Sequence, residues 1–201
     1  DVGVDLGIAT FAATSDGEMF ENPHALERAQ NRIARAQRVV ARRKKGSRRR
    51  RKAARRLARH HFHVTQVRRH HHIRVARALV SQYDTIYVER LNAQALAGSM
   101  LARSVRDAAW GHFQKWLRAK AEEAARTVLE VDPRGTSQFC SECGCEVPKT
   151  LAERVHRCPH CGYVADRDVN AARNILALGR GVRREAPVVD GPQRPEKQRS
   201  T

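Results

Sequence analysis

Two cysteine pairs are the clearest chemical feature of the sequence. Cys140 and Cys143 form one C-x2-C pair, and Cys158 and Cys161 form the second. Four thiolates at this spacing are the ligand set of a closed tetrahedral zinc site. Each second cysteine is followed by a glycine, which tolerates the positive φ of a turn folded around a metal. Because a closed site leaves no position for water or substrate, we predict a structural zinc; a catalytic zinc would need an open position.

The fifth cysteine, Cys145, lies outside the C-x2-C register and is predicted to be a free thiol. All five cysteines fall in one segment, a pattern typical of metal binding in a reducing compartment and not of a secreted disulfide framework. No apolar run approaches the length of a membrane span. We therefore expect a cytoplasmic protein that does not engage a membrane.

Three carboxylates form a second candidate site. Asp5 lies within a predicted strand, Glu89 ends another, and Asp168 opens the last predicted helix. An aspartate among apolar strand residues is costly unless a metal or a hydrogen-bond network holds it. Gly3 and Gly7 flank Asp5 on the same face of the strand, so we expect them to leave space for ions and a phosphate.

Two of the three acids also have a purely structural interpretation. Taken alone, Asp168 is typical of a helix cap and Glu89 of a solvated strand end. Together the three acids are typical of a site that binds two divalent cations about 4 Å apart. Mg²⁺ or Mn²⁺ is the matching metal, because both prefer oxygen ligands. Asp166 is the alternative third acid.

The elements that must position these residues follow from the hydrophobic pattern. Residues 1–22 predict paired strands with a tight turn at Asp16-Gly17. Residues 23–82 predict two long helices that form an antiparallel coiled hairpin, with Asn22 capping the first helix and Pro23 at its first position. Gly46 is expected to cap the end of that helix and Ser47 the start of the next. Further elements are expected at residues 83–91 (strand), 104–125 (helix), 127–132 (strand), 137–165 (cysteine module) and 168–178 (helix).

The chain is strongly basic. It has 39 Lys and Arg against 21 Asp and Glu, a formal net charge of +18, which indicates a polyanionic partner. From Arg42 to Arg56, eleven of fifteen residues are basic. We interpret this run as a phosphate-binding surface without sequence readout, the alternative being a solvated hairpin tip. Its residues are Arg42, Arg43, Lys44, Lys45, Arg48, Arg49, Arg50, Arg51, Lys52, Arg55 and Arg56.

Histidines and aromatic residues give weaker signals. The histidines at 60, 61, 63 and 70–72 have no pair at i, i+4 spacing with an obvious third ligand, so surface or seam positions near phosphates are favoured over a metal site. Helical spacing predicts that Trp110 and Phe113 pack in the core. Trp116 is left open between packing and stacking on bases.

Five segments resemble, in chain order, motifs of the OrfB/TnpB-type proteins encoded by insertion sequences. They are GVDLG, YVERLN, SVRDAAWGHFQKWLRAKA, VDPRGTSQFCSECG and CPHCGYVADRDVNAARNIL, from Gly3 to about Leu178. These proteins are compact relatives of type V CRISPR effector nucleases. The resemblance implies RNA-guided cleavage of DNA by a RuvC-like domain, with an Asp, Glu, Asp triad and Mg²⁺.

Matched residue by residue, the triad is Asp5, Glu89 and Asp168. Asp168 is preferred to Asp166 because the family acid stands two residues before an asparagine, here Asn170. Arg90 stands where the family often has an acidic residue. The family's N-terminal half has no counterpart in the sequence, so we expect a C-terminal piece of a longer protein.

The resemblance implies an α/β fold. We expect an RNase H-like (RuvC-like) mixed sheet with a long helical hairpin insertion and a zinc-ribbon insertion. The nuclease domain would comprise residues 1–136 and 165–179, with the hairpin at 24–82, the ribbon at 137–164 and a disordered basic tail at 180–201. DNA is the implied substrate and a guide RNA the implied partner. Two alternatives stay open: a non-catalytic zinc-ribbon nucleic-acid-binding protein, and a ribosome-associated one.

Overall fold

A five-stranded mixed sheet forms the centre of the computed structural model, which confirms the α/β prediction at this level. The strand order is β3-β2-β1-β4-β5. β1 (Val2–Asp5) lies in the middle, antiparallel to β2 (Thr10–Thr14) and parallel to β4 (Thr85–Glu89). The edges are β3 (Met19–Glu21) and β5 (Thr127–Val131). The structure describes residues 1–90, 102–132, 135–150 and 153–181, and the tail predicted to be disordered lies outside this part from residue 182.

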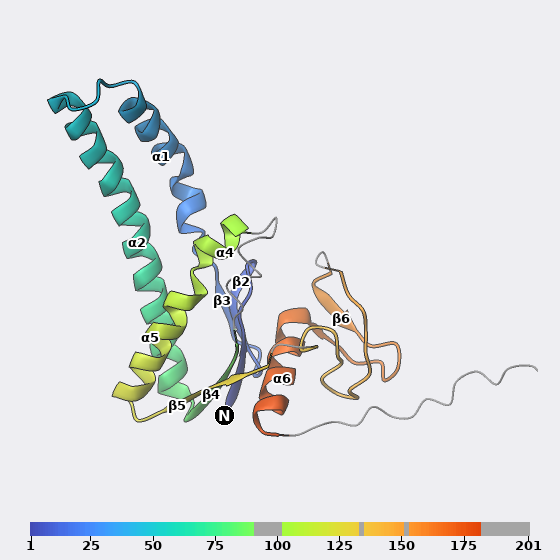
Figure 1. Ribbon diagram of the computed structural model, residues 1–201. Coiled ribbons are helices and arrows are strands. Elements are labelled where there is room, and N and C mark those ends of the chain that lie inside the picture. The colour runs from blue at the N-terminus through green and yellow to red at the C-terminus, as the bar shows by residue number, and fades with distance from the viewer. Residues whose placement is uncertain (91–101, 133–134, 151–152, 182–201) are drawn as a thin grey trace, which may run out of the picture.

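Two long helices form the predicted antiparallel hairpin. α1 (Ala25–Ala41) and α2 (Arg48–Gln82) lie side by side and project away from the sheet (Figure 1). Ile33 and Val64 are buried between them, with Leu57 packed against them at partial exposure. The apolar contacts are few because most side chains at the far end of the hairpin are cationic. The hairpin is therefore joined by a short apolar seam near the sheet.

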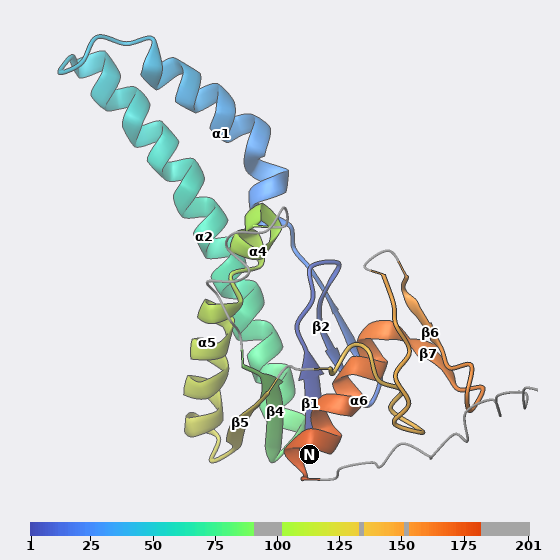
Figure 2. The same cartoon turned by 45° about the vertical axis from the view of Figure 1, so that its right-hand side comes forward.

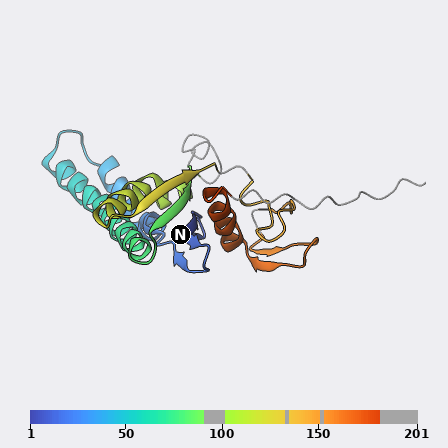
Figure 3. The same cartoon turned by 90° about the horizontal axis from the view of Figure 1, so that it is seen from below.

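Helices cover both faces of the sheet. The second half of α2 and α5 (Trp110–Glu123) pack on one face, and α6 (Arg167–Gly179) packs on the other (Figures 2 and 3). The core between α2, α5 and the sheet contains fully buried Leu79, Phe113 and Phe11. Burial of Trp110 and Phe113 confirms their predicted role in the core. Within the described residues, no helix is both long and apolar enough to cross a bilayer.

The glycine at position 3 has a different role from the predicted one. A Cβ placed on Gly3 would overlap the carbonyl oxygen of Ala172 and the backbone nitrogen of Leu176, both in α6. The expectation that Gly3 leaves space for ions is therefore wrong. The absence of a side chain instead lets the α6 backbone lie directly on β1, which fixes the height of the helix above the strand.

The helix predicted over residues 104–125 is two helices. α4 (Ala102–Ala108) ends before Ala109, whose φ of 52° is left-handed, and α5 begins at Trp110. This break redirects the chain, and both segments then pack on α2 and the hairpin base. The sequence pattern does not reveal this break, because alanine, the residue at position 109, has a high helix propensity.

The first long helix begins and ends differently from the prediction. α1 starts at Ala25, and the side chain of Asn22 accepts a hydrogen bond from the amide of His24 without capping the helix. The cap comes from Asp107, whose carboxylate accepts from the amides of Leu26 and Glu27. α1 ends at Ala41, so Gly46 belongs to the following turn. Ser47 caps α2 as predicted, accepting from the amide of Arg50 at 3.1 Å.

Candidate active site and metal centre

Parallel pairing of β1 with β4 brings the first two acids to the same level of the sheet. The register pairs Gly3 with Tyr87 and Val4 with Val88. One step further along both strands lie Asp5 and Glu89. Because neighbouring strands are about 4.8 Å apart, these two residues stand next to each other at the carboxyl ends of adjacent central strands. Buried valines on both strands hold this register.

The third acid arrives with α6, which runs antiparallel to β1. At one end Leu176 lies over Gly3, and at the other the Oδ2 atom of Asp168 lies 3.8 Å from the Cβ position of Gly7. Eight helical residues and four strand residues both span about 12–13 Å, so the two elements stay in step. Since Asp5 lies between Gly3 and Gly7 on the same strand face, it faces the first turn of α6.

The negative charges of Glu89 and Asp168 act on the carboxyl group of Asp5. The pKa of Asp5 is raised well above its ordinary value, first by burial and then by the negative charges of Glu89 and Asp168. Burial also raises the pKa of Glu89 and that of Asp168, the latter with a further contribution from Asp166. The positive charge of Arg167 offsets part of the effect on Asp5.

Asp166, and not Asp168, caps the start of α6. Its carboxylate accepts hydrogen bonds from the amides of Asp168, at 2.8 Å, and Val169, at 3.3 Å. It is the N-cap of α6. The capping interpretation of Asp168 is therefore wrong. The Asp168 side chain therefore faces β1. A hydrogen bond from Thr10, on β2, offsets part of the increase in its pKa.

Glu89 is held at both its backbone and its side chain. The buried hydroxyl of Thr136 donates to the Glu89 carboxylate, and the side-chain amide of Gln114 donates to its backbone carbonyl at 3.0 Å. The interpretation of Glu89 as a solvated strand end is therefore wrong. Sequence reasoning missed Thr136, because its contact with Glu89 joins residues 47 positions apart and depends on the tertiary fold.

The carboxylates are near one another without forming a tight ligand cage. Their oxygens do not gather within 4.8 Å of one another; among the described residues only the cysteine group does so. Two ions about 4 Å apart would let the outer ligands of a site stand further apart than the ligands of one ion. The donor chemistry of the three carboxylates is that which hard cations prefer.

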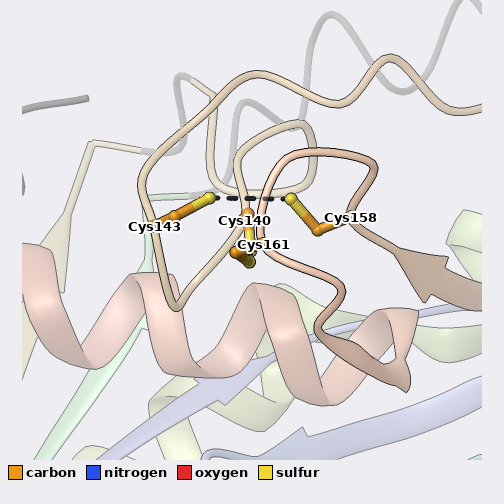
Figure 4. Close-up of side chains that lie close together, drawn as sticks. All are labelled: Cys140, Cys143, Cys158 and Cys161. Atoms are coloured by element: carbon orange, nitrogen blue, oxygen red, sulfur yellow. Dashed lines mark hydrogen bonds between the residues drawn. The ribbon is translucent and has the colours of Figure 1, made fainter. Parts of the chain in front are cut away.

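The four predicted cysteines converge on one point (Figure 4). The sulfur atoms of Cys140, Cys143, Cys158 and Cys161 all lie within 4.8 Å of one another and could hold a metal ion. The Sγ atoms of Cys140 and Cys161 are 3.7 Å apart, and those of Cys143 and Cys158 are 3.6 Å apart. Cys145 is buried outside this group, consistent with its predicted free thiol.

Two turns with the same backbone pattern present the sulfurs. Gly144 and Gly162, with φ of 75° and 76°, donate their amides to the carbonyls of Cys140 and Cys158. The predicted role of these glycines is confirmed. The second turn connects β6 (Val155–Arg157) to β7 (Val164–Asp166), and β7 leads directly into α6. The cysteine module is thus joined without a linker to the helix that carries Asp168.

Asparagines of α6 tie the helix to the first cysteine turn. The fully buried Asn170 accepts from the amide of Ser141 at 3.0 Å and donates to the carbonyl of Phe139 at 2.8 Å. Asn174 donates to the carbonyls of Phe139 and Thr136, both at 2.8 Å. The sequence motif located Asn170 but did not reveal this role.

The basic run lies at the far end of the hairpin. All eleven of its cations except Arg50 are exposed. Residues 28–83 contain no acidic residue, so the run has no neighbouring carboxylates along the hairpin sequence. A cavity of about 400 Å³ between the two helices is lined by Arg43, Arg49, Lys52, Arg56 and Arg59, together with Val39 and Ala53. This surface is suited to phosphate groups.

Two of the histidines, His71 and His72, are buried in the core, which differs from the surface or seam positions predicted for this group. His72 stacks on Phe11, with ring centroids 5.3 Å apart, and His71 meets the same ring edge-on. Burial lowers the pKa of each to about 4, so both are neutral near pH 7. They lie on α2 between the part that packs against α1 and the part that packs on the sheet.

Comparison with known proteins agrees with this arrangement. Residues 1–100 match the family model OrfB_IS605, described as "Probable transposase". Residues 110–175 match the model of the Cas12f1-like TNB domain. The chain belongs to the OrfB/TnpB family. The resemblance drawn from the sequence motifs is thereby confirmed, and the second match covers both α5 and the cysteine module of this OrfB/TnpB chain.

Two curated relatives are named as putative RNA-guided DNA endonucleases. The chain is 39% identical over 181 residues to a "Putative RNA-guided DNA endonuclease" of Streptomyces pristinaespiralis, which covers 89% of this chain and 45% of the relative. It is 34% identical over 198 residues to the "Putative RNA-guided DNA endonuclease InsQ" of Escherichia coli K12, covering 90% and 49%. This OrfB/TnpB chain thus spans about half the length of the curated relatives it matches.

Relatives among CRISPR nucleases match parts of the chain. The "CRISPR-associated endodeoxyribonuclease Cas12f1" of Sulfoacidibacillus thermotolerans is 44% identical over 69 residues, 33% of this chain and 16% of the relative. A cryo-EM structure of a Cas12f1–sgRNA–target DNA complex superimposes with a TM-score of 0.61 at 17% identity, covering 87% of this chain and 48% of that chain. The OrfB/TnpB chain therefore shares its fold with a Cas12f1 chain.

Proposed function

We propose that this chain is the nuclease portion of a transposon-encoded RNA-guided DNA endonuclease with a RuvC-like, RNase H-like domain. The observation that carries the proposal is the arrangement of three acids: Asp5 and Glu89 lie at the carboxyl ends of adjacent central strands, and Asp168 lies in the first turn of α6, which packs on β1. A buried acid whose pKa is raised by neighbouring acids is costly to a fold, so this arrangement favours a function. The names of the relatives support DNA as substrate and RNA as guide.

The donor set fits Mg²⁺ or Mn²⁺. A pair of such ions supplies an activated water and stabilises the leaving oxygen in phosphodiester hydrolysis. Asp5, Glu89 and Asp168 would hold them through carboxylate oxygens. The Thr136 hydroxyl would keep Glu89 turned toward the site, while Asp166 caps α6 and leaves Asp168 free to bind.

The cysteine cluster is proposed to bind a structural zinc. With metal–sulfur bonds of about 2.3 Å, a tetrahedral site has sulfur–sulfur edges of about 3.8 Å. The observed separations of 3.6 and 3.7 Å are close to this value. A ribbon at residues 137–164 would then be a rigid insert between the nuclease sheet and α6. It would set the position of Asp168 through Asn170 and Asn174.

The basic tip of the hairpin is proposed to contact the phosphates of the guide RNA or of an RNA–DNA duplex. Eleven cations in fifteen residues provide sequence-independent attraction. A non-catalytic nucleic-acid-binding protein would need these cations and the zinc, but it would not need three converging carboxylates. The expected cytoplasmic location stays a prediction.

Metal binding tests the catalytic proposal directly. Mn²⁺ binding to the chain is measured by calorimetry for the wild type and for Asp5→Asn, Glu89→Gln and Asp168→Asn. We expect each substitution to weaken binding by about tenfold or more, because each removes a ligand charge. Glu21→Gln, which changes an exposed carboxylate of β3, is the matched control and should bind as the wild type does. Equal Mn²⁺ affinity in all five proteins would reject the site.

Cleavage provides the second test. The full-length protein with a guide RNA should cut complementary DNA in Mg²⁺, and Asp5→Asn should abolish cutting while leaving DNA binding intact. Retained cleavage in Asp5→Asn would exclude this residue from catalysis. Metal binding without cleavage in the wild type would favour the non-catalytic alternative.

A further inference from the structure

A second concave site lies between α2 and α5, away from the carboxylates. It is a cavity of about 300 Å³, at the lower end of the range for ligand sites. Its walls include Arg68, Arg69 and His72 from α2, and Ala109, His112 and Trp116 from the start and middle of α5. We refer to it as the Trp116 cavity.

The indole of Trp116 is not needed to complete the core. α5 buries Trp110, Phe113 and Leu117 against the sheet, whereas Trp116 is half-buried and lies outside that cluster. The guanidinium carbon of Arg69 stands 5.1 Å from the centroid of the Trp116 ring. This cation–π contact places a guanidinium and an indole together at the cavity wall, and we call the pair the Trp116–Arg69 platform.

The electrostatics of the cavity favour an anionic ligand. Arg68 is neutralised by the buried carboxylate of Asp107, at 2.6 Å. Arg69 is exposed and takes part in no ion pair among the residues that the structure describes. Among the residues that the structure describes, no carboxylate lines the cavity, and the exposed His112 adds a ring N–H donor. An aromatic face beside an unneutralised cation is the combination that recognises a base together with its phosphate.

We propose that the Trp116 cavity binds one unpaired nucleotide of a nucleic-acid strand. The base stacks on the Trp116–Arg69 platform, and the phosphate accepts hydrogen bonds from Arg69 and His112. An unpaired nucleotide is required, because the faces of a base inside a duplex are covered by its neighbours. From Arg56 to Arg69 the helix rises about 20 Å, so a strand held at the basic tip can reach the cavity along α2. The inference rests on the nucleic-acid-binding part of the proposed function.

Binding of matched single-stranded and duplex oligonucleotides tests the proposal. Fluorescence anisotropy is measured with the whole chain and without added divalent cation, using single-stranded DNA, single-stranded RNA and a duplex of equal length. Trp116→Leu should weaken single-strand binding by about 5- to 100-fold, the usual effect of losing one stacked base, and duplex binding by less than about twofold. Trp116→Phe should stay within about threefold of the wild type, because a ring remains. Whichever strand is affected more, DNA or RNA, is the source of the nucleotide.

A second variant and a second probe make the result independent of folding defects. Arg69→Gln removes the cation and leaves the indole, and should also weaken single-strand binding selectively. A 2-aminopurine base in the strand should be quenched by the wild type and should recover in Trp116→Leu. If Arg69→Gln and Trp116→Leu bind single strands as the wild type does, or lose single-strand and duplex binding equally, the cavity is not a nucleotide site. These measurements do not depend on cleavage, so loss of catalysis leaves them interpretable.

Discussion

The side-chain amide of Asn170 accepts a hydrogen bond from the backbone amide of Ser141 at 3.0 Å. This contact joins the helix that carries Asp168 to the turn that presents Cys140. Asn170 is completely buried, so neither partner can turn to water if the bond is lost. The cysteine module and the candidate active site are therefore linked through one polar side chain.

The substitution Asn170→Ala should weaken this link. It leaves the buried Ser141 amide without its partner, which should cost about 1–3 kcal/mol of unfolding free energy, whereas the Phe139 carbonyl keeps its hydrogen bond from Asn174. We also expect faster release of zinc to a chelator, because the first cysteine turn loses its anchor. Urea unfolding and a zinc-dye release assay provide the measurements. Asn31→Ala on the exposed face of α1 is the control and should change neither quantity. A normal zinc release rate in Asn170→Ala would contradict the proposed coupling.

The raised pKa of Asp5 predicts how divalent cation binding depends on pH. A cation binds the carboxylate and not the carboxylic acid, so protons compete with it as the pH falls through the raised pKa. The affinity for Mn²⁺ should therefore rise with pH from the ordinary aspartate value of 3.8 upward until the Asp5 carboxyl is deprotonated. Calorimetry at several pH values checks this. A pH-independent affinity above the ordinary range of aspartate would contradict it.

Without a divalent cation, the raised pKa of Asp5 makes the folded state less stable as the pH rises, whereas the affinity for Mn²⁺ rises with pH. Because the folded state holds the Asp5 proton more tightly than the unfolded chain does, the folded state loses stability as the pH rises through this range. Each unit of pKa difference is worth about 1.4 kcal/mol. Asp5→Asn should remove this part of the decline and raise the melting temperature near pH 7. Melting curves with and without Mn²⁺ separate the two effects.

Local chemistry made much of the candidate site predictable. Asp5 was identified because a lone acid in an apolar strand is costly, and the cysteine pairs were identified because their spacing is that of metal ligands. The pattern also located the strands that end in Asp5 and Glu89. What these inferences share is that the signal lies within about ten residues of the residue concerned.

Contacts between distant segments could not be predicted in the same way. The close approach of α6 to Gly3 joins residues some 170 positions apart, and a glycine alone cannot tell an open space from a packed helix. The cap of α1 comes from Asp107, more than eighty residues from the helix start. Thr136 reaches Glu89 from a loop whose position depends on the sheet. In each case the partner is set by the tertiary fold and not by neighbouring sequence.

Substitution of Asp107 should lower the unfolding free energy strongly. Its carboxylate caps α1 and pairs with Arg68, and its side chain is only 7% exposed. Asp107→Ala would leave the largely buried Arg68 unpaired and the first amides of α1 uncapped, at a cost of about 3 kcal/mol or more. Asp84→Ala breaks the exposed ion pair with Arg126 and should cost no more than about 1 kcal/mol. Equal effects of the two substitutions in urea unfolding would refute the capping role.

The basic tip should determine the salt dependence of nucleic-acid binding. Each phosphate contact that releases a counterion contributes about 0.9 to the slope of log affinity against log salt for duplex DNA. Replacing Arg42, Arg43, Lys44 and Lys45 by glutamine removes four exposed cations, so the slope should fall by up to about 3.6 if all four contact phosphates. Anisotropy titrations between about 50 and 200 mM salt measure it. Arg157→Gln changes an exposed cation of β6 in the cysteine module and should leave the slope unchanged. An unchanged slope in the fourfold variant would mean that the hairpin tip is merely solvated.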